Sequence, residues 1–302
     1  MGEENPGREV HFWKVDFTTG ANKSISFEGF IFPGKANFNG AKFWTANFEG
    51  TVFKGGALFQ RAAFETRATF IDAIFEQRAS FITASFEDAT VFLRATFKDV
   101  AEFTGITFNG IVSFSGSRFR IVPDLRATDF KKHVTLHGIE VNFRRPAQYG
   151  DADMYRRLKE LAVNARDHDR EQMFFAYELI AKRGHETHGL KLIPNYLYEW
   201  TSDFGRSLRR PSGWLLGVWF GFGVLYGWVA SKDMSHLWDG LLFSTAQIFP
   251  FLGASRGALG DARNALYGEE PLSVGINAVA FLEGGLGILF PIGLVLRNRF
   301  RI

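Results

Sequence analysis

The sequence predicts a chain of mixed fold, in which a four-sided β-helix is followed by a helical hairpin and then by a membrane domain with two spans. Three observations predict this order. Phenylalanine recurs at steps of five or six residues from residue 27 to residue 119, apolar residues change to helical spacing after residue 146, and two long apolar runs occupy the last third of the chain. The 302 residues include 34 phenylalanines and no cysteine, which excludes a disulfide scaffold and a cysteine nucleophile.

The phenylalanine repeat carries a small residue two positions before most of its phenylalanines. Among the sixteen units that end at Phe38 to Phe119, only Ile106 and Val112 replace the Ala, Thr or Ser of this position. Such a step matches neither the 3.6-residue period of a helix nor the two-residue period of a strand. If each unit turns the chain, four units close a square coil. Its interior then holds the phenylalanine and the small residue, because two large side chains per unit would overfill it.

Alternating steps of five and six give 22 residues per coil, so each phenylalanine should stack on the residue 22 positions later. The predicted columns are Phe59, Phe81, Phe103 and Leu125; Phe64, Phe86, Phe108 and Phe130; Phe70, Phe92, Phe114 and Leu136; and Phe75, Phe97, Phe119 and Val141. Every column ends on an apolar residue. We therefore expect the coil to extend from residue 27 to about residue 143, after an N-terminal segment of residues 1–26.

In these A-x-F units the sequence resembles the pentapeptide-repeat family, whose units read A-(D/N)-L-x-x or A-x-F-x-x. The resemblance covers residues 27–143 and implies a right-handed quadrilateral β-helix. Some relatives mimic DNA through an acidic surface, but residues 27–143 carry 12 acidic and 13 basic residues with their signs interspersed. We therefore expect no nucleic-acid partner. The solenoid is expected to act as a scaffold or to bind a protein partner on its surface.

Residues 151–183 are predicted to form a helical hairpin that seals the end of the coil. Apolar residues recur at helical spacing in residues 152–165 and 169–183. Either Asp167 or Asp169 can cap the second helix. Capping the solenoid is therefore the role that this hairpin is expected to have.

Residues 184–212 are predicted to be a linker that lies at the membrane surface. His185 and His188 are three residues apart with no acidic third ligand nearby, so we expect a solvated segment there and no metal site. Aromatic residues and arginines then mix directly before an apolar run, which is typical of an interfacial segment.

Two apolar runs predict membrane spans at residues 213–230 and 272–296. The first contains 18 residues without a charge, about 27 Å of helix, and the second is interrupted only by Glu283. Basic residues precede the first run and follow the second, whereas residues 231–271 carry three basic and five acidic residues. The positive-inside rule therefore predicts a multi-pass protein of a bacterial-type inner (plasma) membrane, with both termini in the cytoplasm.

Between the spans, residues 237–253 form an apolar stretch that is short for a membrane crossing and contains a proline, so we predict a re-entrant helix. Span, short re-entrant helix, loop and span is the arrangement of two-span cation channels, which residues 213–302 resemble in outline. The resemblance covers layout only, because the filter motif TVGYG is missing from the chain. The candidate pore residues of this stretch are Ser244, Thr245, Gln247 and Pro250.

Glu283 is the most informative single residue, because a carboxylate near the middle of a span is costly in lipid. Asn277 is expected to share or neighbour its face of the helix. A ring of Glu283 side chains in a homo-oligomer would line or gate a pore, whereas a protonated Glu283 would hydrogen-bond to a neighbouring helix. Glycines and Pro291 on the same helix make it bendable, which favours the pore over the hydrogen bond.

The sequence contains no recognisable phosphate loop, catalytic triad, metal cluster or paired carboxylates, so we predict neither an enzyme nor a cofactor. It favours a homo-oligomeric membrane pore or ion-channel-like protein whose cytoplasmic solenoid serves as sensor or scaffold. The alternative is a membrane-anchored scaffold whose solenoid binds a protein partner without conduction. Residues 237–253 and Glu283 separate the two hypotheses, because a simple anchor needs neither.

Overall fold

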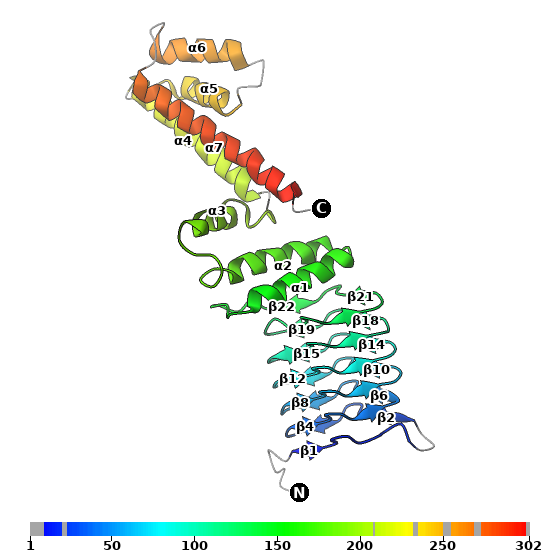
Figure 1. Cartoon of the computed structure of the whole chain (residues 1–302). Coiled ribbons are helices and arrows are strands. Elements are labelled where there is room, and N and C mark those ends of the chain that lie inside the picture. Colours follow the sequence, from blue (N-terminus) through cyan, green and yellow to red (C-terminus); the bar gives the residue numbers. More distant parts are fainter. Residues whose placement is uncertain are drawn as a thin grey trace. The chain divides into compact units, whose positions relative to one another are not determined.

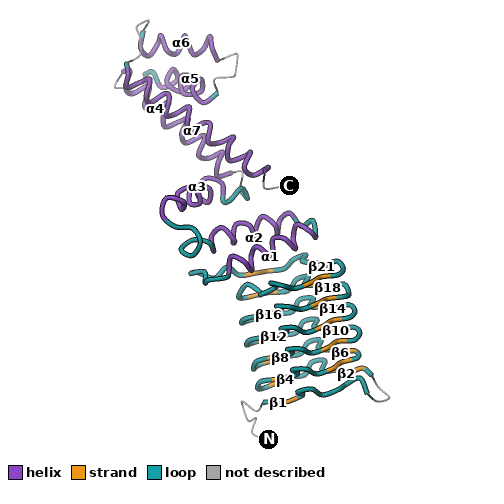
Figure 2. Tube along the Cα trace, viewed as in Figure 1, coloured by secondary structure: helices purple, strands orange, loops and turns teal. Residues whose placement is uncertain are grey.

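The computed structural model describes residues 9–19, 23–207, 209–231, 235–249, 255–268 and 273–299. The chain divides into two compact units, Met1–His188 and Gly189–Ile302. The first unit holds all the strands described and two of the helices, and the second unit is helical (Figures 1 and 2).

The first unit is a solenoid in which short parallel strands stack into four sheets, one on each side of the coil. The first sheet contains β1 (Val10–His11), β4 (Ala36–Asn37), β8 (Ala57–Leu58), β12 (Ala79–Ser80) and β16 (Ala101–Glu102). The second contains β2 (Ser24–Ser26), β6 (Thr45–Asn47), β10 (Ala68–Thr69), β14 (Thr90–Val91), β18 (Val112–Ser113) and β21 (Val134–Thr135). The third contains β3 (Ile31–Phe32), β7 (Val52–Phe53), β11 (Ile74–Phe75), β15 (Thr96–Phe97), β19 (Arg118–Phe119) and β22 (Glu140–Val141). The fourth contains β5 (Lys42–Phe43), β9 (Ala63–Phe64), β13 (Ser85–Phe86), β17 (Thr107–Phe108) and β20 (Asp129–Phe130).

The strand register confirms the predicted solenoid and its 22-residue step. Phe86 lies opposite Phe64 and Phe108 in the neighbouring strands. The stacked rings of these pairs have centroids 4.5 and 4.8 Å apart, respectively. Because neighbouring strands are also about 4.7–4.9 Å apart, ring stacking and backbone hydrogen bonding stabilise the same geometry.

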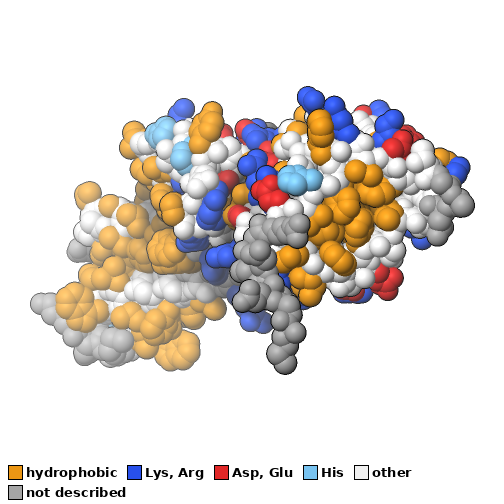
Figure 3. Space-filling view, turned by 90° about the horizontal axis from the view of Figure 1, so that it is seen from below, with side chains coloured by type: hydrophobic (Ala, Val, Ile, Leu, Met, Phe, Trp, Pro, Cys, Tyr) orange, Lys and Arg blue, Asp and Glu red, His pale blue; other side chains and the backbone are white. Residues whose placement is uncertain are grey.

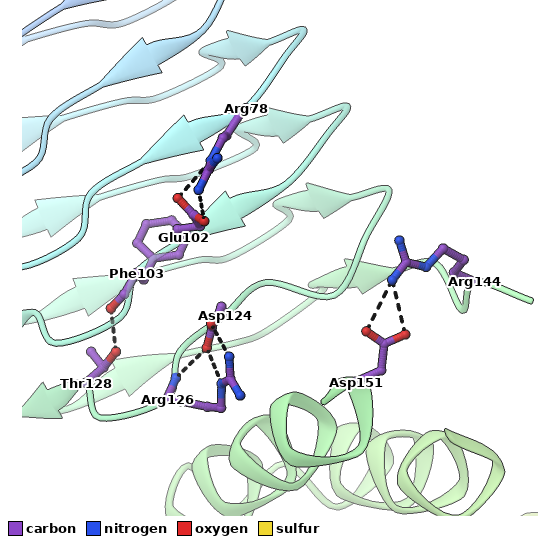
Figure 4. Close-up of polar contacts among 8 residues, drawn as sticks. All are labelled: Arg78, Glu102, Phe103, Asp124, Arg126, Thr128, Arg144 and Asp151. Carbon is purple, nitrogen blue, oxygen red and sulfur yellow. Dashed lines mark hydrogen bonds and ion pairs between the residues drawn. The ribbon is translucent and has the colours of Figure 1, made fainter. Parts of the chain in front are cut away.

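The small positions of the repeat are buried, as predicted. Ala84 is 2% exposed, and the two exceptions to the small-residue rule, Ile106 and Val112, are 1% and 0% exposed. The hydroxyls of Thr51, Ser117 and Thr128 at this position donate to backbone carbonyls in the preceding coil, whereas that of Thr90 donates to the carbonyl of Asp88 within its own coil. Thr128, for example, donates to the carbonyl of Phe103 at 2.7 Å (Figure 4). Polar members of this position are therefore buried without losing a hydrogen bond.

The solenoid begins before the predicted boundary at residue 27. Within the described parts of residues 1–26, β1 pairs with β4 and β2 pairs with β6. The ring of Phe12 stacks on that of Phe38 with centroids 4.7 Å apart. These two residues are 26 positions apart instead of 22, so the sequence period breaks although the column continues. The prediction of a separate N-terminal segment is wrong for these residues.

Two helices, α1 (Asp151–Asn164) and α2 (His168–Ala181), pack on the C-terminal end of the solenoid. Their side chains Leu158 and Phe174 are both 0% exposed and belong to the same apolar core as the phenylalanine columns. The hairpin therefore covers the last coil, whose ring edges would otherwise meet water.

Polar contacts set where the two helices of this hairpin begin. Asp167 is the N-cap of α2, because its carboxylate accepts from the backbone N–H of Arg170 at 3.1 Å. At the start of α1, Asp151 pairs with Arg144 from the end of the solenoid, at 3.3 Å (Figure 4). Of the two capping residues considered from the sequence, Asp167 is thus the one that caps.

A buried carboxylate joins the helices of the hairpin. The side chain of Glu178 in α2 is 4% exposed and lies 3.1 Å from Arg156, 2.7 Å from Lys159 and 2.6 Å from Lys182. Burial by itself would raise the pKa of Glu178. The hydrogen bonds from Lys159 and Lys182 outweigh it and hold the pKa below its ordinary value.

The second unit contains η1 (Gly189–Lys191), α3 (Leu192–Ser202), α4 (Arg209–Ser231), α5 (Leu237–Ile248), α6 (Ser255–Tyr267) and α7 (Val274–Arg299). Figure 1 shows α4 and α7 running side by side in opposite directions, and α5 contacts both of them as well as α6. Among the described residues, Arg209–Ala230 form the one helix long and apolar enough to cross a membrane, and Val274–Gly287 form a shorter apolar stretch. The second predicted span therefore stays a prediction.

Neighbouring coils of the solenoid approach so closely that some glycines have no room for a side chain. A Cβ built on Gly55 would lie 2.4 Å from the carbonyl carbon of Gly34, whereas one on Gly56 would meet nothing nearer than 3.7 Å. We expect Gly55→Ala to lower the free energy of unfolding by about 3 kcal/mol because two coils must separate. Gly56→Ala should change it by less than about 0.5 kcal/mol. Urea denaturation of a fragment of residues 1–188 measures both, and equal stabilities would contradict this close approach.

Glu178→Gln should destabilise the same fragment at neutral pH by about 2–3 kcal/mol, because it leaves three cations without their shared carboxylate. The pKa of Glu178 is lowered on folding, so its contribution is present above the unfolded-state pKa and is lost as the pH falls through the folded-state value. The difference between wild type and Glu178→Gln should therefore shrink below about pH 4.5. Denaturation at several pH values tests this; a difference independent of pH would assign the loss to packing.

Candidate functional site

Glycines let α4 and α5 pack with their backbones in contact. A Cβ built on Gly240 of α5 would lie 2.2 Å from the carbonyl oxygen of Gly223 and 2.8 Å from the nitrogen of Gly227. The four-residue spacing of the two α4 glycines is typical of close helix contacts in membranes, where small residues allow backbones to approach. The short helix α5 is thus held directly against α4.

Glu283 of α7 lies at the centre of the helical unit. It is 0% exposed although its side chain is ionisable. The hydroxyl of Tyr226 in α4 donates to Oε2 of Glu283 at 2.8 Å, and Oγ of Ser244 in α5 lies 2.5 Å from Oε1. One side chain therefore joins α4, α5 and α7, and its two partners are 57 and 39 positions away in the sequence.

Ser244 connects Glu283 to the backbone of α4. Its Oγ lies 2.9 Å from the carbonyl oxygen of Trp219 as well as 2.5 Å from Glu283. A hydroxyl has one proton and can donate to only one of these two oxygens at a time. Ser244 of α5 thus lies between the α4 backbone and the Glu283 carboxyl and contacts both.

Thr245 and Gln247, two further residues predicted for a pore, also lie where α5 meets its neighbours. Oγ1 of Thr245 accepts from the indole N–H of Trp219 at 2.8 Å and donates to the carbonyl of Leu241 at 2.8 Å. Gln247 is half-buried, and its backbone carbonyl faces Gly284 of α7, where an added Cβ would lie 3.6 Å from it. Both residues therefore belong to helix contacts within one chain.

The remaining two predicted site residues do not join this cluster. Pro250 lies outside the described residues. Asn277 is exposed whereas Glu283 is fully buried, so the expected shared face is wrong. Six residues of α-helix turn through about 600°, which leaves these two side chains roughly 120° apart around α7.

The geometry favours one of the two interpretations of Glu283. Within one chain its carboxyl is enclosed by α4 and α5 and hydrogen-bonded to both, which is the interhelical contact considered as the alternative to a pore ring. Tyr226 is the residue that the sequence argument missed. A phenol in the interior of an apolar span was the available signal, because such a hydroxyl needs a partner in lipid.

Titratable residues elsewhere in the described part of the chain can be compared with the requirements of a metal site. Within the part of the chain that the structure describes, no three His, Asp or Glu side chains come close enough to hold a metal ion. The ring nitrogens of His185 and His188 lie 3.1 and 2.9 Å from the backbone carbonyls of Ala147 and His185, respectively. These two histidines therefore stabilise the chain around them.

The comparisons with known proteins concern the solenoid. Residues 92–140 match the family model described as pentapeptide repeats (9 copies), and this stretch lies among the coils with the stacked phenylalanine columns. The solenoid is a pentapeptide-repeat domain. Neither the comparison with curated proteins nor the one with solved structures gives a match.

The surface of the pentapeptide-repeat domain has no dominant sign of charge. Charged side chains pair between neighbouring coils, for example Arg94 with Asp72 at 2.5 Å and Lys98 with Glu76 at 2.8 Å. Figure 3 is viewed toward the N-terminal end of the domain and shows basic and acidic side chains interspersed around its perimeter, with apolar side chains gathered on the end. Such a surface lacks the single-sign field that would attract a nucleic acid or imitate one.

Glu283→Leu should destabilise the helical unit, because it leaves the hydroxyl of Tyr226 buried without its acceptor, at roughly 1–3 kcal/mol, and removes one of the two contacts of Ser244. Glu283→Gln should be nearly neutral, since an amide accepts from Tyr226 and donates to Ser244. The measurement is the temperature at which detergent-solubilised protein loses its monodisperse elution profile. In the Glu283→Leu background, Tyr226→Phe should restore part of the loss, because it removes one unpaired group. A Glu283→Leu protein as stable as wild type would contradict the buried network.

Proposed function

We propose that this protein is a membrane-anchored scaffold, in which the C-terminal helices hold the pentapeptide-repeat domain at a membrane. The observation that carries the proposal is the exposure of α4. This helix is apolar over the length of a membrane span, yet its large side chains Leu216, Phe220 and Trp228 are 61%, 53% and 56% exposed. Exposing so much apolar surface to water is unfavourable, whereas exposing it to lipid is not.

The length and direction of α7 support a second crossing. Its 26 residues correspond to about 39 Å of helix, enough for the hydrocarbon core of a bilayer. Because α4 and α7 run in opposite directions, the arginines at the start of α4 and those at the end of α7 belong to the same end of the pair (Figure 1). By the positive-inside rule this end faces the cytoplasm, so both termini are cytoplasmic in the proposed bacterial-type inner membrane.

The pentapeptide-repeat domain supplies the scaffold in this proposal. Its core is built of stacked phenylalanines and its ion pairs run between coils, so each coil is held by its neighbours and the surface is presented rigidly. The interspersed charges favour a protein partner over a nucleic acid. The surface side chains, which vary from coil to coil without disturbing the core, determine which protein the domain binds.

A second candidate function, ion conduction by a homo-oligomer, is favoured by α5. This helix has 12 residues, about 18 Å, which is too short to cross a bilayer, and it contacts both long helices of the unit. Two-span cation channels have a long helix, a short helix and a second long helix in this order. Here a further short helix, α6, lies between α5 and α7, where the sequence predicted a loop. In this candidate α5 supports the pore entrance, and the Glu283 network holds it in place instead of lining the pore.

The anchoring proposal predicts that the full chain stays with membranes on alkaline extraction, whereas residues 1–188 are released. Because the chain has no cysteine, single cysteines report topology without background. Gly257→Cys, at an exposed position of α6 between the two proposed crossings, should react with an impermeant thiol reagent in intact cells. The matched control Glu65→Cys, on an exposed position of the solenoid, should react only after permeabilisation. Release of the full chain, or labelling of Glu65→Cys in intact cells, would overturn the proposal.

Current recording from the purified protein in planar bilayers decides between the two candidates. Reproducible cation current that responds to a substitution in α5, such as Gln247→Ala, favours conduction. The anchored scaffold is favoured if the protein is inserted and correctly oriented but passes no current over a range of pH, voltage and salt.

A further inference from the structure

The helix α3 presents an apolar face that the described residues leave uncovered. Ile193, Tyr196, Leu197 and Trp200 are between 50% and 56% exposed. Their positions follow the i, i+3, i+4, i+7 pattern, so they form one stripe along the helix. With Glu199 and Arg210 they line an open groove of about 630 Å³.

The groove is continuous with the start of the proposed membrane helix. The ring centroids of Trp200 in α3 and Trp214 in α4 are 4.0 Å apart, so the apolar stripe of α3 leads directly onto the first turns of α4. Trp214 is itself 41% exposed. Any lipid that surrounds α4 is therefore in reach of the groove at the level where tryptophans mark the membrane interface.

The segment that carries the groove has surplus positive charge, with Lys191, Arg206, Arg209 and Arg210 against Glu199 and Asp203. The groove itself is lined by Arg210 and Glu199. Arg206 and Arg210 share the single carboxylate of Asp203, at 2.8 and 3.7 Å. Arg210 also donates to the backbone carbonyl of Glu199 at 3.3 Å, which directs its guanidinium to the groove. Each guanidinium has five N–H donors, so Arg206 and Arg210 keep donors for a further anion beside Asp203 and Glu199.

We propose that this groove binds one anionic phospholipid, with the phosphate at Arg210 and an acyl chain along the stripe of α3. The inference rests on the proposed membrane anchoring and adds the class of lipid that is recognised. An open apolar groove beside Arg210, in a segment of net positive charge, matches a phospholipid, whose chain is apolar and whose headgroup is an anion. The binding site also explains why α3 stays amphipathic beside a helix that is apolar on every side.

The test uses the full-length protein in detergent and measures lipid binding by native mass spectrometry. The probes are dioleoyl phosphatidylglycerol, which is anionic, and dioleoyl phosphatidylcholine, which has no net charge. We expect the first phosphatidylglycerol to bind at least fivefold more tightly than phosphatidylcholine. Arg210→Gln should weaken phosphatidylglycerol binding about fivefold, the effect of one cation near a membrane surface, and leave phosphatidylcholine unchanged. Trp200→Ala should weaken both lipids because it shortens the apolar groove.

Lys191→Gln is the matched control, because it removes one positive charge from the exposed start of α3 without touching the groove. It should change the phosphatidylglycerol affinity less than twofold. Equal losses for Lys191→Gln and Arg210→Gln would mean diffuse attraction to charge and would overturn the site. Displacement of the lipid by millimolar inorganic phosphate would identify a phosphate site instead and overturn it as well. A chain that resists alkaline extraction but shows no preference between the lipids refutes this inference alone, whereas a chain released by alkali refutes the anchoring on which it rests.

Discussion

Stacking of one phenylalanine on another in every coil is the interaction on which the solenoid depends. The centroids of stacked rings lie between 4.5 and 5.2 Å apart from Phe48 to Phe130, close to the separation that parallel strands impose on their backbones. A ring that leaves its column therefore breaks a stacking contact and disturbs a strand pair together. The small residue two positions earlier is a consequence, since the interior of the square coil has room for one large side chain on each side.

Because the interior of the solenoid is constrained by this stacking, amino-acid substitutions are tolerated mainly at the ends of the coil and on its outer surface. At the C-terminal end, α1 and α2 add their apolar side chains to the core, and Glu178 with its three cations holds the two helices together. On the outside, pairs such as Arg78 with Glu102 connect neighbouring coils on one sheet (Figure 4). Each of these exposed ion pairs contributes little to the free energy of folding. Surface residues that would contact a partner can therefore be substituted with little loss of stability.

Whereas apolar rings form the core of the solenoid, the helices of the second unit are joined by a polar group that is enclosed among apolar side chains. In the proposed membrane setting, lipid provides no hydrophobic force between helices, so close glycine contacts and hydrogen bonds hold them together. Gly240 brings α5 onto α4, and Glu283 connects both of them to α7. The same carboxyl that the sequence marks as costly in lipid thus serves as the common hydrogen-bond partner of three helices. Its burial within one chain is the reason that anchoring, instead of a pore ring, is the function supported best.

The sequence by itself determined the parts of this protein that depend on local period. The spacing of phenylalanine predicted the coil, its columns and its end near residue 143, because each unit repeats the same short-range requirement. Only the tertiary structure decided that the coil starts before residue 27, since Phe12 joins its column across 26 positions and leaves no period to detect. It also separated Asn277 from Glu283 and brought Tyr226 and Ser244 to that carboxyl. Such contacts join residues 39 and 57 positions apart, and they follow from how the helices pack, which no local pattern of side chains records.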